Sequence, residues 1–164
     1  MGLIERRPRG LLRVLLRSPI LAYRAGFGWL FGHRLVYLVH RGRKSGKRRE
    51  TVLEVVGYDG GKPEVVVVSG WGHGSDWYRN ISAAPALEIR IGTQRWHNPR
   101  QRTLTVDQTV EVLRAYQARH PRAWHRIAPM LGIPLDPGAP AALDQLDHVP
   151  AVAFSPGPDR GPAT

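Results

Sequence analysis

The sequence contains no cysteine among its 164 residues. This absence excludes disulfides, thiolate metal ligands and cysteine nucleophiles, and it is typical of proteins that work in a reducing cytoplasm. Acidic residues are also scarce, with 13 Asp and Glu against 24 Lys and Arg, so the formal net charge is +11. A surplus of this size indicates an anionic partner, which could be a nucleic acid, a membrane surface, or a phosphorylated or carboxylated small molecule.

Long apolar runs and metal-binding motifs are missing as well. No stretch approaches the ~18 apolar residues of a membrane span, and Arg13 and Arg17 interrupt the early apolar stretch, so we expect no secretory signal. The seven histidines are scattered and none belongs to an HExxH motif, so we expect no metal site. These absences favour a cytoplasmic protein.

The N-terminal residues 1–33 differ in pattern from the rest of the chain. Their leucines and arginines recur with helical spacing on opposite faces, which predicts a basic amphipathic helical segment. Such a segment either covers one mouth of the core or lies on anionic lipid, peripheral at the inner face of the membrane. We expect a folded domain over residues 34–155, followed by a flexible Pro/Gly-rich tail over 156–164.

From residue 34 onward the pattern changes to short strands with turns between them. Six runs fit strands: 35–40, 51–58, 64–69, 87–91, 94–103 and 149–155. A hairpin is predicted at Asp59-Gly60-Gly61-Lys62, where glycines accept positive φ. The run of four valines at 65–68 favours a strand that is buried on both faces or lies at a barrel seam.

Helices are predicted at only a few places along the domain. Ser75 can cap a short helix that stops before Pro85, Thr105 and Gln108 form a capping box that opens a longer one, and a further helix fits 122–131. Residues 132–140 are expected to be a connection. The predicted fold is therefore mainly β (α+β), a small barrel of about six mostly antiparallel strands with peripheral helices.

The turn between the first two predicted strands is strongly basic. Six of the nine residues 41–49 are Arg or Lys, and none is acidic. A flexible cationic turn with free backbone N–H groups is suited to an anionic ligand. The alternatives are a solvated charged hairpin and a contact to nucleic acid, and the nearby aromatic residues are not interleaved with the cations as a base-stacking surface requires.

A second cluster, Ser69 to Asn80, pairs glycines with large aromatic residues, as in a loop that lies against a flat ring. Trp71, flanked by Gly70 and Gly72, is a candidate to line a pocket. Because no catalytic constellation of side chains is visible, an enzyme of this kind would rely on a cofactor. Phosphate at one end and a planar ring at the other indicate a nucleotide-like or flavin-like cofactor.

Three motifs in order resemble those of a known family. They are Gly42-Arg43-Lys44-Ser45-Gly46, Ser69-Gly70, and Trp77-Tyr78-x-Asn80 followed by Ala84-Pro85 and the 87–91 strand. Residues 33–125 thereby resemble the deazaflavin-dependent nitroreductase family, oxidoreductases with a split β-barrel that use coenzyme F-420 (8-hydroxy-5-deazaflavin). The resemblance implies hydride transfer from the reduced cofactor to a small conjugated acceptor of the quinone or enone type.

The resemblance also implies where the cofactor lies. Its phosphate and acidic tail would meet Arg43, Lys44, Ser45, Gly46, Arg49 and Thr51. Its ring would lie by Val67, Val68, Ser69, Gly70, Asp76, Trp77, Tyr78 and Asn80. Candidates for the acceptor side are Trp71, His73, Tyr116 and Trp124. FMN is the alternative cofactor, and a non-catalytic or membrane-associated binder of an apolar or lipid ligand is the alternative function. The oligomeric state stays open.

Overall fold

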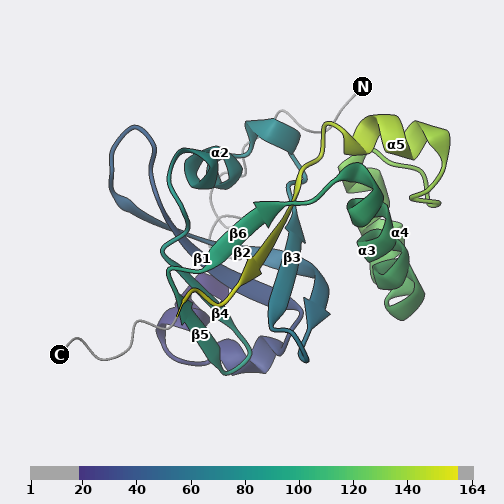
Figure 1. Cartoon of the computed structure of the whole chain (residues 1–164). Coiled ribbons are helices and arrows are strands. Elements are labelled where there is room, and N and C mark those ends of the chain that lie inside the picture. Colours follow the sequence, from purple (N-terminus) through teal and green to yellow (C-terminus); the bar gives the residue numbers. More distant parts are fainter. Residues whose placement is uncertain (1–18, 159–164) are drawn as a thin grey trace, which may run out of the picture.

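The structure is a computed structural model that describes residues 19–158 (Figure 1). Its centre is a seven-stranded antiparallel sheet with the order β5-β4-β1-β2-β3-β7-β6. The strands are β1 (Leu35–Arg41), β2 (Arg48–Asp59), β3 (Glu64–Val68), β4 (Glu88–Ile91), β5 (Gln94–His97), β6 (Arg100–Thr103) and β7 (Ala151–Ser155). The predicted mainly β fold is confirmed.

The sheet is curled, so that its two edge strands come together at one corner. β5 and β6 lie at opposite ends of the strand order, yet only Asn98 and Pro99 separate them in the chain. Asn98 has a φ of 46°, a conformation that asparagine tolerates better than most residues, and Pro99 has no N–H to donate to a ladder. The single strand predicted over 94–103 is therefore two strands, which makes the barrel seven-stranded and leaves it split.

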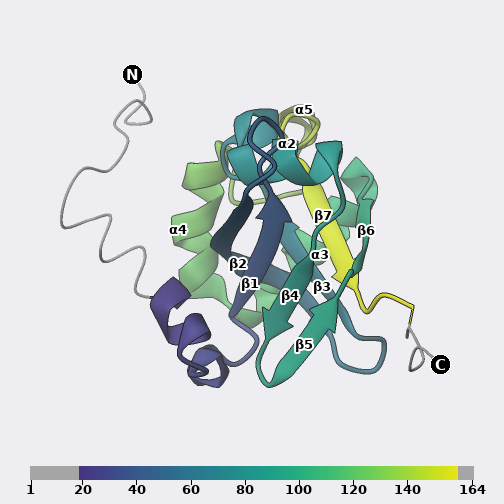
Figure 2. The ribbon, with the colours of Figure 1, turned by 90° about the vertical axis from the view of Figure 1, so that its left-hand side faces the viewer.

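Helices surround the barrel. They are η1 (Gly28–Phe31), η2 (Gly72–Gly74), α2 (Asp76–Ala83), α3 (Val106–Arg119), α4 (Pro121–Leu131) and α5 (Pro140–Leu146), and residues 19–24 are also helical. α3, α4 and α5 gather on one side of the barrel, whereas α2 sits at one end (Figures 1 and 2). The capping box of Thr105 and Gln108 at the start of α3 is confirmed. α5 was not predicted, because prolines and glycines just before it favoured a loop.

Alternation along the strands divides the interior into two cores. Val65 and Val67 on β3 point into the barrel, where they pack with Trp77, and Val66 points outward to the helices. The small side chains Ala151 and Ala153 on β7 also face the helices. The valine run is therefore buried on both faces, as predicted, because the barrel has a second hydrophobic layer outside it.

The hairpin between β2 and β3 forms where it was predicted but by another mechanism. The Asp59 carboxylate accepts hydrogen bonds from the backbone N–H groups of Gly61 (2.8 Å) and Lys62 (3.2 Å). Neither Gly60 nor Gly61 has positive φ. The aspartate side chain, rather than glycine freedom, sets this turn.

The described part of the N-terminal segment covers the outer face of β1. Tyr23 is buried against Tyr37 and Val39, and its hydroxyl donates to the Leu35 carbonyl at 2.7 Å. This favours the covering role for residues 19–33; the amphipathic helix predicted before residue 19, like the tail from 159, lies outside the described residues. No helix between residues 19 and 158 is long and apolar enough to cross a membrane.

A buried carboxylate holds the outer face of β4 together. Glu88 is 3% exposed and is bonded by Arg90 and by Arg95, the latter at 2.9 Å. Burial alone would raise the pKa of Glu88, but the hydrogen bonds from Arg95 and Arg90 outweigh it and hold the pKa below its usual 4.5. A carboxyl group with a lowered pKa stabilises the fold above that usual value and loses the contribution as pH falls through the folded-state pKa.

The variant Glu88→Gln should therefore lower the free energy of unfolding at pH 7 by about 2 kcal/mol, the scale of hydrogen bonds to a charged group. The difference from the wild type should shrink as pH falls below 4.5, because Glu88 is then protonated in the unfolded chain first, and it should be lost as pH falls through the lower folded-state pKa. Urea unfolding between pH 3.5 and 7 measures this. Glu111→Gln, an exposed change on α3, is the control. A difference that is the same at both ends of the range would contradict the assignment.

Candidate functional site

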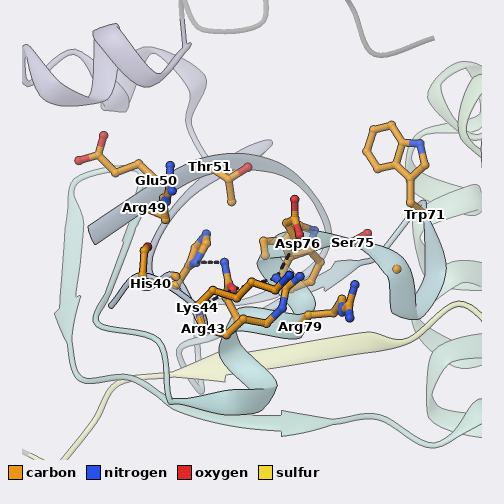
Figure 3. A pocket seen from close by; sticks show the side chains of 15 residues that line it. His40, Arg43, Lys44, Arg49, Glu50, Thr51, Trp71, Ser75, Asp76 and Arg79 are labelled. Atoms are coloured by element: carbon orange, nitrogen blue, oxygen red, sulfur yellow. Dashed lines mark hydrogen bonds and ion pairs between the residues drawn. The ribbon is translucent and has the colours of Figure 1, made fainter. Parts of the chain in front are cut away.

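A cleft of about 1010 Å³ opens between the basic turn and the start of α2 (Figure 3). Fifteen residues line it, from the end of β1, the turn, the start of β2, the loop before α2, and α2 itself. The two clusters that the sequence singled out, about thirty residues apart in the chain, thus face the same space. This volume is at the upper end of the range of small-molecule sites.

The basic turn is a closed, rigid loop. The N–H of Gly42 donates to the carbonyl of Lys47 at 2.8 Å, and the N–H of Gly46 donates back to the carbonyl of Gly42 at 2.7 Å. Gly46 has a φ of 64°, and a Cβ on Gly42 would lie 2.7 Å from the Ser45 Oγ. The shape of the loop therefore favours glycine at position 46, whereas a side chain at position 42 would displace only the Ser45 hydroxyl.

The loop on the opposite side of the cleft is fixed from beneath. Ser69 is fully buried, and its hydroxyl donates to the carbonyl of Gly72 at 2.6 Å and is also bonded to the hydroxyl of Ser75. Gly72 has a φ of 59°, and a Cβ there would lie 2.6 Å from the His148 carbonyl oxygen. These contacts set the point at which α2 begins.

α2 carries polar residues on the side that faces the turn. Asp76, Arg79 and Asn80 line the cleft at helical spacing, while Trp77 packs mainly into the barrel. Arg43 joins the two sides: its guanidinium bonds the Oδ1 atoms of Asp76 (3.0 Å) and Asn80 (3.1 Å), and its backbone N–H donates to the same Asn80 oxygen at 3.0 Å.

The cleft has more positive than negative charge. Its two carboxylates already have partners, because Asp76 pairs with Arg43 and Glu50 pairs with Arg24. The remaining cations of the cleft are Lys44, Arg49 and Arg79, and none of them takes part in an ion pair within residues 19–158. Three exposed cations around one space are suited to a ligand with several negative charges.

The structure brings together eight of the residues predicted to bind the cofactor. Arg43, Lys44, Ser45, Arg49, Thr51, Asp76, Trp77 and Asn80 all line the cleft. Gly46 shapes the turn without lining the cleft. Five others, Val67, Val68, Ser69, Gly70 and Tyr78, do not line it either. Of these, Val67 points into the barrel and Val68 toward the helices. Among the five, Ser69 supports the loop through its hydrogen bonds with Gly72 and Ser75.

The cleft also contains residues outside that predicted set: His40, Gly42, Glu50, Gly74, Ser75 and Arg79. His40 could have been found from the sequence, because Val36 and Leu38 point into the barrel and the alternation of β1 then turns His40 to the same side. Glu50 gave no such signal, because it pairs with Val39 and so alternates with Arg49 and Thr51, the residues of β2 that were predicted to bind the cofactor.

The predicted acceptor side needs correction. Trp71 lines the cleft and is 69% exposed, and His73 is an exposed residue of η2 that lies outside the lining. Tyr116 and Trp124 are buried in the core between the helices and the outer face of the barrel. The Tyr116 hydroxyl donates to Glu54 at 2.6 Å, and the Trp124 indole N–H donates to the Leu135 carbonyl at 2.8 Å. Tyr116 and Trp124 therefore contribute to the packing of the core, because the faces of α3 and α4 that carry them point toward the sheet.

Comparison with known proteins identifies a family. The sequence model described as F420H(2)-dependent quinone reductase matches residues 21–126. No curated protein matches this chain.

Several solved structures have folds similar to that of this chain. An F420-H2 dependent reductase is 16% identical, with a TM-score of 0.52 over 76% of this chain and 96% of its own. A protein of unknown function from Agrobacterium tumefaciens is 16% identical, with a TM-score of 0.49 over 93% of this chain and 58% of its own. A pyridoxamine 5'-phosphate oxidase-related, FMN-binding protein from Nostoc punctiforme is 13% identical, with a TM-score of 0.44 over 90% and 81%. At such identities the first of these supports the split-barrel fold alone.

Proposed function

We propose a division of roles within the cleft, from the premise that this chain belongs to the F420H(2)-dependent quinone reductase family. The protein is an oxidoreductase that uses coenzyme F-420. In our proposal, Lys44, Arg49 and Arg79 bind the negative charges of the cofactor, Arg43 fixes the shape of the site, and Trp71 forms the acceptor side. The substrate is a small quinone.

The observation that carries this proposal is the set of cleft cations that have no ion pair within residues 19–158. Lys44 extends from the basic turn, Arg49 from β2 and Arg79 from α2, so the three charges approach one space from different elements. Arg43 has a different role, because Asp76 and Asn80 already hold its guanidinium. The donor set suits a phosphate with an acidic tail, because arginine and lysine bind anionic oxygens through charge-assisted hydrogen bonds.

When bound, the reduced deazaflavin supplies a hydride. The chain itself orients the acceptor over the cofactor and excludes water, and it supplies no acid–base pair from the residues of the cleft. The carboxylate of Asp76 is committed to Arg43, and His40 is buried beneath the turn. Trp77 and Ser75, which are both buried, line the cleft together with the exposed indole of Trp71. Trp71 lies across the cleft from Arg49 and Lys44 (Figure 3), and its indole suits a flat, uncharged acceptor.

The variants Lys44→Ala, Arg49→Ala and Arg79→Ala should each raise the dissociation constant for oxidised coenzyme F-420 by about tenfold, because each removes a charge-assisted contact. Fluorescence quenching of the cofactor measures this. Arg114→Ala on α3, whose guanidinium lies 3.8 Å from Asp136, is the matched control and should bind as the wild type does. Unchanged binding by all three cleft variants would remove the basis of the proposal.

The variant Trp71→Ala should raise the KM for a soluble naphthoquinone about tenfold, because it removes an aromatic surface worth roughly 1–3 kcal/mol to a bound flat ring. The dissociation constant for the cofactor should change less. Tyr116→Phe is the control, because this buried residue should affect folding stability without changing the KM. Steady-state kinetics that gave both variants the same KM would place the acceptor elsewhere.

A second proposal concerns a peripheral attachment to anionic membranes. Among the described residues, Leu21, Phe27, Trp29 and Leu30 of the N-terminal segment are each more than half exposed. Large apolar side chains beside arginines are typical of surfaces that lie at the lipid interface. The segment would then hold the enzyme close to an apolar quinone dissolved in the membrane.

The triple variant F27S/W29S/L30S should lose most of the co-sedimentation of the full chain with vesicles of equal parts phosphatidylglycerol and phosphatidylcholine. Burial of these side chains in the interface drives the attachment, at ~25 cal/mol per Å² of apolar surface. Met130→Ser on α4 also removes an exposed apolar side chain and should sediment as the wild type does. If the wild type stays in the supernatant, the attachment does not occur.

A further inference from the structure

Two polar side chains that line the cleft are buried beneath the basic turn and contact each other. His40 at the end of β1 is 4% exposed, and Asn80 on α2 is 5% exposed. The Nδ2 atom of Asn80 lies 3.1 Å from the Nδ1 atom of His40 (Figure 3). The Oδ1 atom of the same amide lies 3.0 Å from the backbone nitrogen of Arg43 and 3.1 Å from its guanidinium.

The chemistry of these groups allows only one arrangement of protons. A backbone N–H and a guanidinium can only donate, so the Asn80 atom that faces them must be its carbonyl oxygen. The amide NH₂ then faces His40 and can only donate. The Nδ1 atom of His40 must therefore accept, and the proton of the neutral ring sits on Nε2.

We propose that Asn80 is the positioning residue of the cofactor-binding turn, and that His40 sets the orientation of its amide. The inference rests on the proposed function of the cleft and adds to it a regulation of cofactor binding by the charge of His40. With His40 neutral, the Asn80 oxygen holds the turn at Arg43, both at the backbone and at the side chain. The turn is thereby kept in the shape that presents Lys44 to the ligand.

Protonation of His40 reverses this arrangement. Both ring nitrogens of an imidazolium donate, so the Asn80 amide has to rotate and offer its oxygen to His40. Its NH₂ group then faces the N–H of Arg43, and two donors face each other. The hydrogen bond at the backbone of the turn is lost, while Asp76 continues to hold the guanidinium. The amide of Asn80 thus has two orientations, and the protonation state of His40 determines which one is adopted.

The surroundings of His40 favour the neutral ring. Burial lowers the pKa of His40 below its usual 6.5; a hydrogen bond to the backbone of Arg41 raises it, the charge of Arg49 on β2 lowers it, and the carboxylate of Asp76 on α2 raises it. The guanidinium of Arg43 faces the same amide. β4 turns Ile89 and Ile91 to this side of the sheet, and neither carries a charge. The reversal therefore occurs as pH falls below 6.5.

The first test observes the proton directly and needs no cofactor. Nitrogen-15 NMR of the histidine rings at pH 7.5 should show a neutral His40 protonated at Nε2, and the variant His40→Asn identifies its signals by their loss. In Asn80→Asp the new carboxylate should raise the pKa of His40 above that of the wild type. A ring protonated at Nδ1 at pH 7.5 would overturn the inference.

The second test measures the dissociation constant for oxidised coenzyme F-420 between pH 5 and 8. Binding by the wild type should weaken about tenfold as His40 becomes protonated, the scale of one buried hydrogen bond that is left unmade. His40→Asn places an amide oxygen near the position of Nδ1 and does not titrate, so it should bind well at pH 7.5 and show no such weakening. Asn80→Ala should bind about tenfold more weakly at pH 7.5 and should show none either.

A matched control and the possible outcomes complete the test. Ser82→Ala, an exposed change on α2 whose hydroxyl donates to the Tyr78 carbonyl, should follow the wild type at every pH. If binding by the wild type strengthens or stays constant as pH falls, the regulation by His40 is refuted, but the proposed cofactor site is not. The predicted NMR result without any binding of the cofactor would refute the proposed function and leave the buried network intact.

Discussion

The clamp between Arg43 and α2 is the contact on which the site depends. It joins a turn between two strands of the barrel to a helix that begins 33 residues later, through hydrogen bonds to Asp76 and Asn80. One guanidinium and one backbone N–H are sufficient because each partner is itself fixed, Asn80 by burial and the turn by its two internal hydrogen bonds. Without this contact, the basic turn would be a hairpin in solvent beside an unrelated loop.

This clamp changes the meaning of the positive charge in the cleft. Arginines at such a site are often all regarded as ligand contacts, but the structure separates them by their partners. Arg43 is committed to Asp76 and Asn80, whereas the other cations that line the cleft have no ion pair within the described residues. An arginine that is bonded within the protein fixes the shape of the site, whereas one without a protein partner attracts the anionic ligand. A site that binds a polyanion needs both kinds. Asn80 is buried among these charges because it holds Arg43, the arginine that fixes the shape of the site.

Much of the architecture followed from local patterns. Alternation along the strands, the capping box at Thr105 and the turn residues identified the barrel and the main helices, because these signals act over a few neighbouring residues. The prediction failed where two local signals competed. The chain at 94–103 reads as one strand until the left-handed Asn98 and Pro99 divide it, and α5 follows a segment rich in breakers of helices. Tyr116 and Trp124 were misplaced because aromatic residues look alike in a sequence whether they face a core or a ligand.

The sequence by itself determined the composition of the site: a cationic turn closed by glycines, a loop of glycines and aromatic residues, and no acid–base constellation. These properties belong to short segments, and local chemistry is enough to define them. Only the tertiary structure decided which cations have no ion pair within the described residues, that His40 and Asn80 meet beneath the turn, and that Tyr116 and Trp124 lie in the core rather than at the cleft. Such facts depend on the curl of the sheet and on contacts between distant segments, whose geometry no local pattern encodes.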